Sequence, residues 1–207
     1  MDKRSFLKEA GAASLAAGVL LTSRSSQAQV ASDQARVLIA YHSVTGNTEK
    51  MAQGVADGAK SVAGATADLK RVSDVTTEDL LSADAVIVGS PVYFGNVSGE
   101  VKTFLDNWFL KFGVFREGKM RNKVGAAFVT GAAVSNGKET AMQAIHAALI
   151  MNQMVIVSAG GAFGAYGASA TTGPDSPGID DKKLEGARAL GERVAEFAAI
   201  IRRGSRT

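Results

Sequence analysis

The chain has 207 residues, of which 46% are hydrophobic and 21% are charged, with 23 glycines, three prolines and no cysteine. This composition is typical of one globular domain with a full core, and the missing thiols exclude disulfides, iron–sulfur clusters and cysteine nucleophiles. Residues 1–28 contain four of the 23 basic and two of the 20 acidic residues, which leaves a net charge of +1 for the remainder. A nearly neutral domain gives a nucleic-acid partner no electrostatic support. Two histidines without metal-like spacing predict no metal site.

Residues 1–28 have the layout of an export signal. Lys3-Arg4 precede an apolar run that is short for a bilayer span, and Ser26-Gln27-Ala28 offers small residues to a signal peptidase. Residues 3–8 resemble bacterial twin-arginine signals with lysine in place of the first arginine, which implies export of a folded chain to the periplasm. The general secretory route and an uncleaved membrane anchor are the alternatives.

A polar tether at 29–35 is predicted to lead into a domain that spans 36–203. Short apolar runs there alternate with helical patterns; strands are predicted at 36–41, 67–72, 85–89, 124–129 and 154–157, and helices at 47–63, 99–109, 139–151 and 181–201. Continuously apolar strands are covered on both faces, so the pattern predicts a doubly wound, five-stranded parallel sheet with helices on both faces. Residues 160–178 are predicted to form one long glycine-rich loop.

The segment 43–48, Ser-Val-Thr-Gly-Asn-Thr, follows the first predicted strand and opens a helix. Hydroxyls, backbone N–H groups and the positive end of a helix dipole converge there, which favours a phosphate. The segment has neither the lysine of a Walker A loop nor the three glycines of a dinucleotide fingerprint, so a phosphate monoester such as flavin mononucleotide (FMN) suits it. An ordinary helix start with a Ser/Thr cap is the alternative.

Two further loops are expected at the same edge, because ligands bind beyond the carboxyl ends of parallel strands. Residues 90–96 supply Tyr93 and Phe94 beside a glycine and an asparagine, and residues 130–137 supply small side chains and bare backbone N–H groups. An aromatic wall with backbone groups at its edge suits a planar ring system. Core packing is the alternative for the two aromatic residues.

On these motifs the chain resembles the flavodoxin-like superfamily and, within it, the tryptophan-repressor-binding-protein type of NAD(P)H:quinone oxidoreductase. Residues 166–169, 172–173 and 187–195 match as well, so the resemblance spans nearly the whole domain. It implies non-covalent FMN, NAD(P)H as co-substrate, a quinone or another small electron acceptor, and a homo-oligomer, commonly a tetramer.

The resemblance also implies the residues that bind FMN. They are Ser43, Val44, Thr45, Gly46, Asn47 and Thr48 in the first loop, Pro91, Val92, Tyr93, Phe94, Gly95 and Asn96 in the second, and Thr130, Gly131, Ala132, Ala133, Ser135, Asn136 and Gly137 in the third. Candidate donors to a quinone oxygen are Tyr93, Asn96 and Asn152. The family usually has a histidine where this chain has Met151-Asn152-Gln153.

Together these features predict an FMN-dependent oxidoreductase that reduces quinones by two electrons from NAD(P)H in the periplasm. A flavodoxin-type electron carrier and a non-catalytic FMN-binding protein are the alternatives; small carriers are usually strongly acidic, which this chain is not. Trp108 and His146 are expected to have structural roles. Lys119, Arg121 and Lys123 are expected to form a solvated basic turn.

Overall fold

The computed structural model describes residues 34–160, 164–173 and 178–205. Ala35–Thr207 forms one compact unit. The predicted export signal and nearly all of the predicted tether lie outside the described residues, so both stay predictions. None of the helices in the described ranges is long and apolar enough to cross a bilayer.

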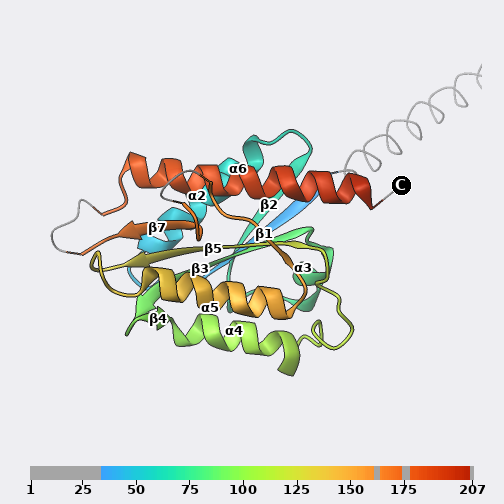
Figure 1. Cartoon of the computed structure of the whole chain (residues 1–207), viewed down its shortest axis with the longest axis horizontal. Helices are drawn as coiled ribbons and strands as arrows, with labels where there is room; N and C mark the ends of the chain where they lie inside the picture. Colours follow the sequence, from blue (N-terminus) through green and yellow to red (C-terminus); the bar gives the residue numbers. More distant parts are fainter. Residues whose placement is uncertain (1–33, 161–163, 174–177, 206–207) are drawn as a thin grey trace, which may run out of the picture. The chain divides into compact units, whose positions relative to one another are not determined.

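The centre of the fold is a parallel sheet with the strand order β2-β1-β3-β5-β6, which confirms the predicted five-stranded architecture (Figure 1). The strands are β1 (Ala35–Tyr41), β2 (Ala65–Arg71), β3 (Ala85–Tyr93), β4 (Asn96–Val97), β5 (Val124–Gly131), β6 (Val155–Ile156) and β7 (Ala168–Thr171). The two-residue strand β4 pairs antiparallel with β3. The edge beside β5 is shared, because β6 pairs with its first residues and β7 with its last.

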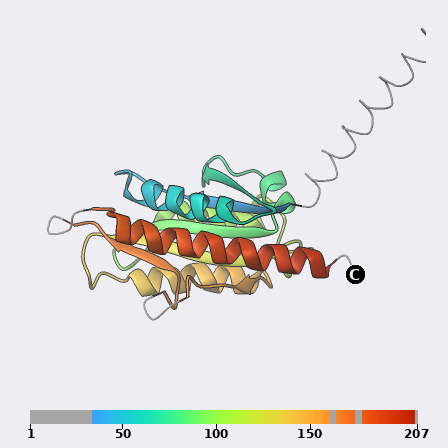
Figure 2. The same cartoon turned by 90° about the horizontal axis from the view of Figure 1, so that it is seen from above.

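Helices cover both faces of the sheet (Figures 1 and 2). They are α2 (Asn47–Ser61), α3 (Thr77–Ser82), α4 (Gly99–Leu110), α5 (Lys138–Met151) and α6 (Asp181–Gly204). Val37 and Ile39 of β1 pack in the layer under α2 and α6, whereas Leu38 and Ala40 pack in the layer with α3, α4 and α5. Both faces of the strand are therefore buried, which explains its unbroken apolar sequence.

Helices α2 and α6 touch through their backbones. A Cβ atom on Gly58 would lie 2.0 Å from the Arg188 carbonyl oxygen, and one on Gly191 would lie 1.9 Å from the Val55 carbonyl oxygen. No side chain larger than hydrogen fits at either position without moving the backbone. This close approach fixes the axis of α2, and with it the position of its N-terminus.

Two elements differ from the sequence prediction. The predicted loop at 160–178 is wrong at Ala168–Thr171, because these residues form β7 and pair with the end of β5. Their small side chains give little strand signal; the pairing comes from the long β5 beside them. Helix α3 was not predicted because six residues are too few for a periodic pattern. A capping box starts it, with Thr76 Oγ1 accepting from the Asp79 N–H at 3.2 Å.

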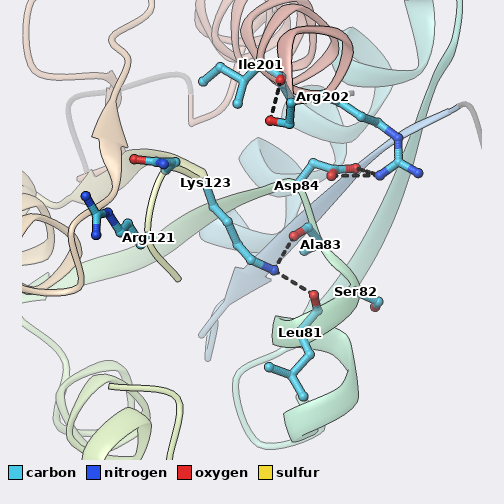
Figure 3. A pocket seen from close by; sticks show the side chains of 11 residues that line it. Leu81, Ser82, Ala83, Asp84, Arg121, Lys123, Ile201 and Arg202 are labelled. Atoms are coloured by element: carbon cyan, nitrogen blue, oxygen red, sulfur yellow. Dashed lines mark hydrogen bonds and ion pairs between the residues drawn. The ribbon is translucent and has the colours of Figure 1, made fainter. Parts of the chain in front are cut away.

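The amino edge of the sheet corrects the prediction for Lys123 (Figure 3). Its ammonium is not solvated with its neighbours but donates to the carbonyl oxygens of Leu80, Leu81 and Ala83 at 2.9, 2.7 and 2.6 Å. These carbonyls belong to the C-terminal end of α3, where intrahelical partners run out. Burial of the ammonium lowers the pKa of Lys123. Beside it, Arg202 of α6 bonds to the Asp84 carboxylate at 2.8 Å.

The structural role expected for Trp108 is confirmed. Its side chain is buried and packs edge-on against Phe104 with 5.8 Å between ring centroids.

Candidate functional site

The three loops singled out in the sequence meet at the carboxyl edge of the sheet. The N–H after β1, on His42, donates to the Gly89 carbonyl of β3 at 3.1 Å. Loops one and three are joined by the hydroxyls of Thr48 and Thr130, whose oxygens lie 2.8 Å apart. Loops two and three touch where a Cβ on Gly137 would meet the backbone oxygen of Gly95 at 2.5 Å.

The first loop has the unsatisfied groups of an anion site. Ser43 is buried, and its hydroxyl has no hydrogen-bond partner in the described part of the chain. Gly46, at φ +84°, is the N-cap of α2, and no side chain bonds to the N–H groups that follow it. Space is open around Gly46, since a Cβ there would meet nothing within 4 Å. A buried hydroxyl and free helix N–H groups together favour a bound anion.

The other hydroxyls of this loop have local partners. Thr45 is exposed, and its Oγ1 accepts from the Asn47 side-chain amide at 3.2 Å. Thr48 is buried against Thr130, so its hydroxyl already ties two loops together. Val44 is exposed and extends the loop with an apolar side chain.

Arg71, at the end of β2, holds the first loop from the side. Its Nη1 donates to the Ser43 carbonyl at 3.0 Å and its Nη2 to Glu49 at 2.9 Å. The Tyr41 hydroxyl donates to the other Glu49 oxygen at 2.7 Å. Burial of Tyr41, with its hydrogen bond to Glu49, raises the pKa of the phenol. Arg71 was not predicted as a site residue, although it follows the rule used for the loops: a polar residue where a parallel strand ends.

The second loop presents aromatic surface on a constrained backbone. Phe94 is fully exposed at φ +49°, and Gly95 follows at φ +80°. A non-glycine residue at positive φ stores strain, which is common at ligand sites. Tyr93 is 43% exposed and Asn96 is exposed as well, while Pro91 is buried. The loop therefore offers an apolar wall with polar groups beside it.

The third loop is held by a buried lysine that the sequence analysis also missed. Lys138 Nζ donates to the carbonyls of Ala133 and Val134 at 2.6 and 2.9 Å and to Thr171 Oγ1 at 3.2 Å. Burial lowers the pKa of this ammonium. Its place at the first residue of α5 was the available signal, because the helix dipole disfavours a cation there. Two loop carbonyls are thus engaged, and Gly137 starts α5 without a side-chain cap.

One candidate residue does not join the others. Asn152 is the C-cap of α5 and donates to the Ala148 carbonyl at 2.8 Å. The N-terminus of this 14-residue helix is at the site, so its C-terminus lies about 20 Å away along the axis at 1.5 Å per residue. Asn152 therefore cannot reach the three loops of its own chain, and Tyr93 and Asn96 remain as donors.

Neither histidine holds a metal-like position. His42 is half-buried, with Nε2 at 3.5 Å from Glu100 Oε2. His146 is buried in α5, away from the loops, in agreement with its expected structural role. Within the described ranges, no group of three or more His, Cys, Asp or Glu side chains is placed to bind a metal ion.

Comparison with known proteins gives relatives of one kind. The sequence profile described as NADPH-dependent FMN reductase matches residues 75–167. An "NAD(P)H dehydrogenase (quinone)" of Geotalea uraniireducens is 31% identical over 81% of this chain and all of its own length. A protein of the same name from Gluconacetobacter diazotrophicus is 32% identical over 80% of this chain and 98% of its own.

Solved structures agree on the fold. A flavodoxin, WrbA-like protein from Agrobacterium tumefaciens superposes with a TM-score of 0.66 at 27% identity, covering 80% of this chain and 98% of that one. An archaeal flavodoxin gives a TM-score of 0.63 at 22% identity, with 79% and 98% covered.

The strand order and the three loops at its switch point define a flavodoxin-like α/β protein. The curated relatives match it at 31–32% identity over about four fifths of the chain and nearly all of their own length. The chain belongs to the NAD(P)H dehydrogenase (quinone) family.

The residues present fit the FMN that the family implies. Its phosphate monoester would satisfy the buried Ser43 hydroxyl and the uncapped N-terminus of α2 at once. The open space at Gly46 admits the phosphate oxygens close to the backbone. The exposed aromatic surface of Tyr93 and Phe94 suits the flavin ring.

Proposed function

We propose that this protein is an FMN-dependent NAD(P)H:quinone oxidoreductase. The observation that carries the proposal is the buried hydroxyl of Ser43, which has no partner in the described residues. Ser43 belongs to the loop that leads to Gly46, the N-cap of α2, where no side chain caps the helix. Buried polar groups are nearly always satisfied, so this hydroxyl points to a ligand with acceptor oxygens. Membership in a family of quinone dehydrogenases supports FMN as that ligand.

The three loops would share the binding of FMN. Ser43 and the first N–H groups of α2 would hold the phosphate, since no side chain bonds to them. The exposed Thr45 hydroxyl accepts from Asn47 and would give its own proton to the phosphate. Tyr93 and Phe94 would flank the ring, and backbone N–H groups of the third loop would bind its polar edge. FMN, when bound, supplies the two-electron redox chemistry, and the protein supplies orientation and electrostatics.

The mouth of the site is open and apolar. Val44, Tyr93, Phe94 and Val134 all expose large hydrophobic side chains there. Such a rim suits flat aromatic molecules, so nicotinamide and quinone would occupy the same face in turn. One face used alternately predicts ping-pong kinetics. The Tyr93 hydroxyl and the Asn96 amide are the donors available to a quinone oxygen.

The test is an anaerobic titration of the purified protein loaded with FMN. We expect NADH or NADPH to bleach the flavin absorption within seconds and benzoquinone to restore it. Reduction in two separate one-electron steps, with no response to the nicotinamide, would favour an electron carrier. A protein that takes up no FMN from solution would refute the proposal at its first step.

We also propose that the enzyme acts in the periplasm. The support is the sequence of residues 1–28, with Lys3-Arg4, an apolar run and a small-residue cleavage site. Fractionation of bacteria that express the full chain tests this. We expect a processed flavoprotein in the periplasm, and an unprocessed cytoplasmic chain for the Arg4→Lys variant. Export of that variant at the wild-type level would argue for the general secretory route.

We further propose that the chain forms a homo-oligomer through α4 and α5. Large apolar side chains are exposed at the C-terminal ends of these helices, namely Leu110 of α4 and Ile150 and Met151 of α5. A groove of about 590 Å³ between the two helices is lined by small or apolar residues such as Ala144 and Ala147, together with the polar residues Asn96, Lys102 and Asp106. Contiguous exposed apolar surface marks association sites. Light scattering of the wild type should give a multiple of the chain mass, and Met151→Lys should lower it.

A further inference from the structure

The first loop of the candidate site depends on an arginine from another strand. Arg71 is the last residue of β2, and its guanidinium bonds to the Ser43 carbonyl at 3.0 Å and to Glu49 at 2.9 Å. Ser43 carries the unsatisfied hydroxyl, and Glu49 belongs to the first turn of α2. One planar side chain therefore spans the loop from its first residue to the helix that follows.

The bond to Ser43 controls the direction of its hydroxyl. A carbonyl fixed by a charged donor fixes the peptide plane, and the plane limits where the side chain of the same residue can point. Ser43 itself is buried, so few rotamers are open to it. Without the arginine, the peptide after β1 has no such restraint.

The bond to Glu49 reduces the repulsion between its carboxylate and a bound phosphate. A carboxylate in the first turn of α2 lies beside the helix N-terminus where a phosphate dianion would bind, and two like charges at that range repel. Arg71 neutralises one Glu49 oxygen, and the Tyr41 hydroxyl occupies the other at 2.7 Å. The Arg71 guanidinium also stacks on the Tyr41 ring at 5.5 Å, which holds it in this place.

We propose that Arg71 is a positioning residue for the FMN phosphate: it aims the Ser43 hydroxyl and screens the Glu49 carboxylate from the phosphate. This inference rests on the proposed function. The loop 43–48 contains no cation of its own, and Arg71 supplies one from the end of β2 by bonding to the Ser43 carbonyl. A lysine would not replace it, because an ammonium cannot present two donors in a fixed planar fork.

The test compares FMN with riboflavin, which lacks the phosphate, as ligands of the apoprotein. Arg71→Met keeps the apolar stem and removes the guanidinium. We expect the dissociation constant of FMN to rise by about 10- to 100-fold, in line with the loss of charge-assisted bonds. The constant for riboflavin should stay within about twofold. A purely structural role would weaken both ligands alike and would overturn the inference, as would unchanged FMN binding.

Two further variants keep the test decisive. Arg36→Met is the matched control, because Arg36 also makes a cross-strand ion pair, with Asp68 of β2 at 3.5 Å, but at the other end of β1. Arg36→Met should change the dissociation constant of neither FMN nor riboflavin. The double variant Arg71→Met/Glu49→Gln removes the repelling charge together with its screen, so it should recover part of the FMN affinity lost in Arg71→Met. No recovery contradicts the screening role.

The phosphorus NMR resonance of bound FMN gives a second readout that does not depend on riboflavin. We expect it to move in Arg71→Met and to stay in Arg36→Met, because only the first alters the phosphate surroundings. An unmoved resonance in Arg71→Met would overturn the inference while leaving FMN binding intact. A wild-type protein that binds neither ligand would instead show that the proposed function is wrong.

Discussion

The hydroxyl of Thr48 lies 2.8 Å from the hydroxyl of Thr130, and both side chains are buried. The two residues are 82 positions apart and belong to the first and third loops of the candidate site. A single hydrogen bond thus joins the phosphate end of the site to the loop expected at the polar edge of the ring.

This pair makes a prediction for the apoprotein. Thr130→Val should lower the free energy of unfolding by about 1–3 kcal/mol, because it leaves the buried Thr48 hydroxyl unpaired. The double variant Thr48→Val/Thr130→Val should cost less than the sum of the single variants, since no orphaned hydroxyl remains. Urea denaturation measures all three. Strictly additive costs would show that the two hydroxyls do not interact in solution.

A different outcome is expected at Ser43. Ser43→Ala should weaken FMN binding by about 1–3 kcal/mol, the range for a lost bond to a charged acceptor. It should not destabilise the apoprotein, because the hydroxyl has no partner to lose among the described residues. Calorimetry gives the first value and denaturation the second. Ser73→Ala is the control, since within the described residues the Ser73 hydroxyl donates only to the carboxylate of its neighbour Asp74; it should leave FMN binding unchanged.

The third loop should loosen when its lysine is removed. Lys138→Met leaves the carbonyls of Ala133 and Val134 without their donor, so we expect a loss of about 1–3 kcal/mol and faster amide exchange across 132–137. The loss is limited because burying the ammonium is itself costly, as the lowered pKa of Lys138 indicates. Lys102→Met is the control; its exposed pair with Asp106 should contribute about 0.5 kcal/mol or less. Equal losses of stability in the two variants would show that Lys138 has no structural role in the third loop.

Contact between the second and third loops can be tested with one methyl group. Gly137→Ala introduces a Cβ 2.5 Å from the Gly95 carbonyl oxygen at a residue with φ +88°, so both strain and collision oppose it. Gly64→Ala is matched, with φ +80° and open space, and should cost only the conformational strain, about 1–2 kcal/mol. Denaturation should show a larger loss for Gly137→Ala, and FMN affinity should fall in that variant alone. Matching values in the two variants would mean that the loops can separate freely.

His146 predicts a pH dependence of stability. Burial lowers its pKa in the folded state below the ordinary value of about 6.5. Above pH 6.5 His146 is neutral in both the folded and the unfolded chain, so it does not change the free energy of unfolding. As the pH falls below 6.5 the unfolded chain binds the proton first, so the free energy of unfolding decreases until the folded-state pKa is reached. His146→Gln should remove this decrease, and His42→Gln should retain it; identical pH profiles for wild type and His146→Gln would contradict the prediction.

The sheet could be predicted from sequence because its strands are buried on both faces. Val37 to Tyr41 and Ala85 to Val88 have no polar break, and the alternation of strands and helices predicts a parallel sheet with helices on both faces. Strand β7 could not be predicted, because Ala168–Thr171 pairs by its place beside β5 and not by its composition. The short helix α3 was not predicted either, because a capping box and not a periodic pattern defines it.

The candidate site was also predicted only in part. The loops at 43–48, 90–96 and 130–137 could be found because each follows a recognisable strand, and the structure brings them together. Arg71 acts on a neighbouring loop, and Lys138 acts on carbonyls just before its own helix and on Thr171 of β7. Their places in the sequence were a signal, but their bonding partners depend on the distance between strands and on burial, which a single sequence does not contain. Asn152 does not lie with the other candidates, because it follows the C-terminus of α5 and only the N-terminus of this helix is at the site.

The backbone contact between α2 and α6 has a consequence for how the protein is made. Gly58 and Gly191 let the last helix lie directly against the helix that begins at the phosphate loop. The nascent chain lacks this support until residue 191 and those beyond it have left the ribosome. We therefore expect the cofactor to be acquired only after α6 has left the ribosome and packed against α2, so that any export of the loaded protein must wait for this packing.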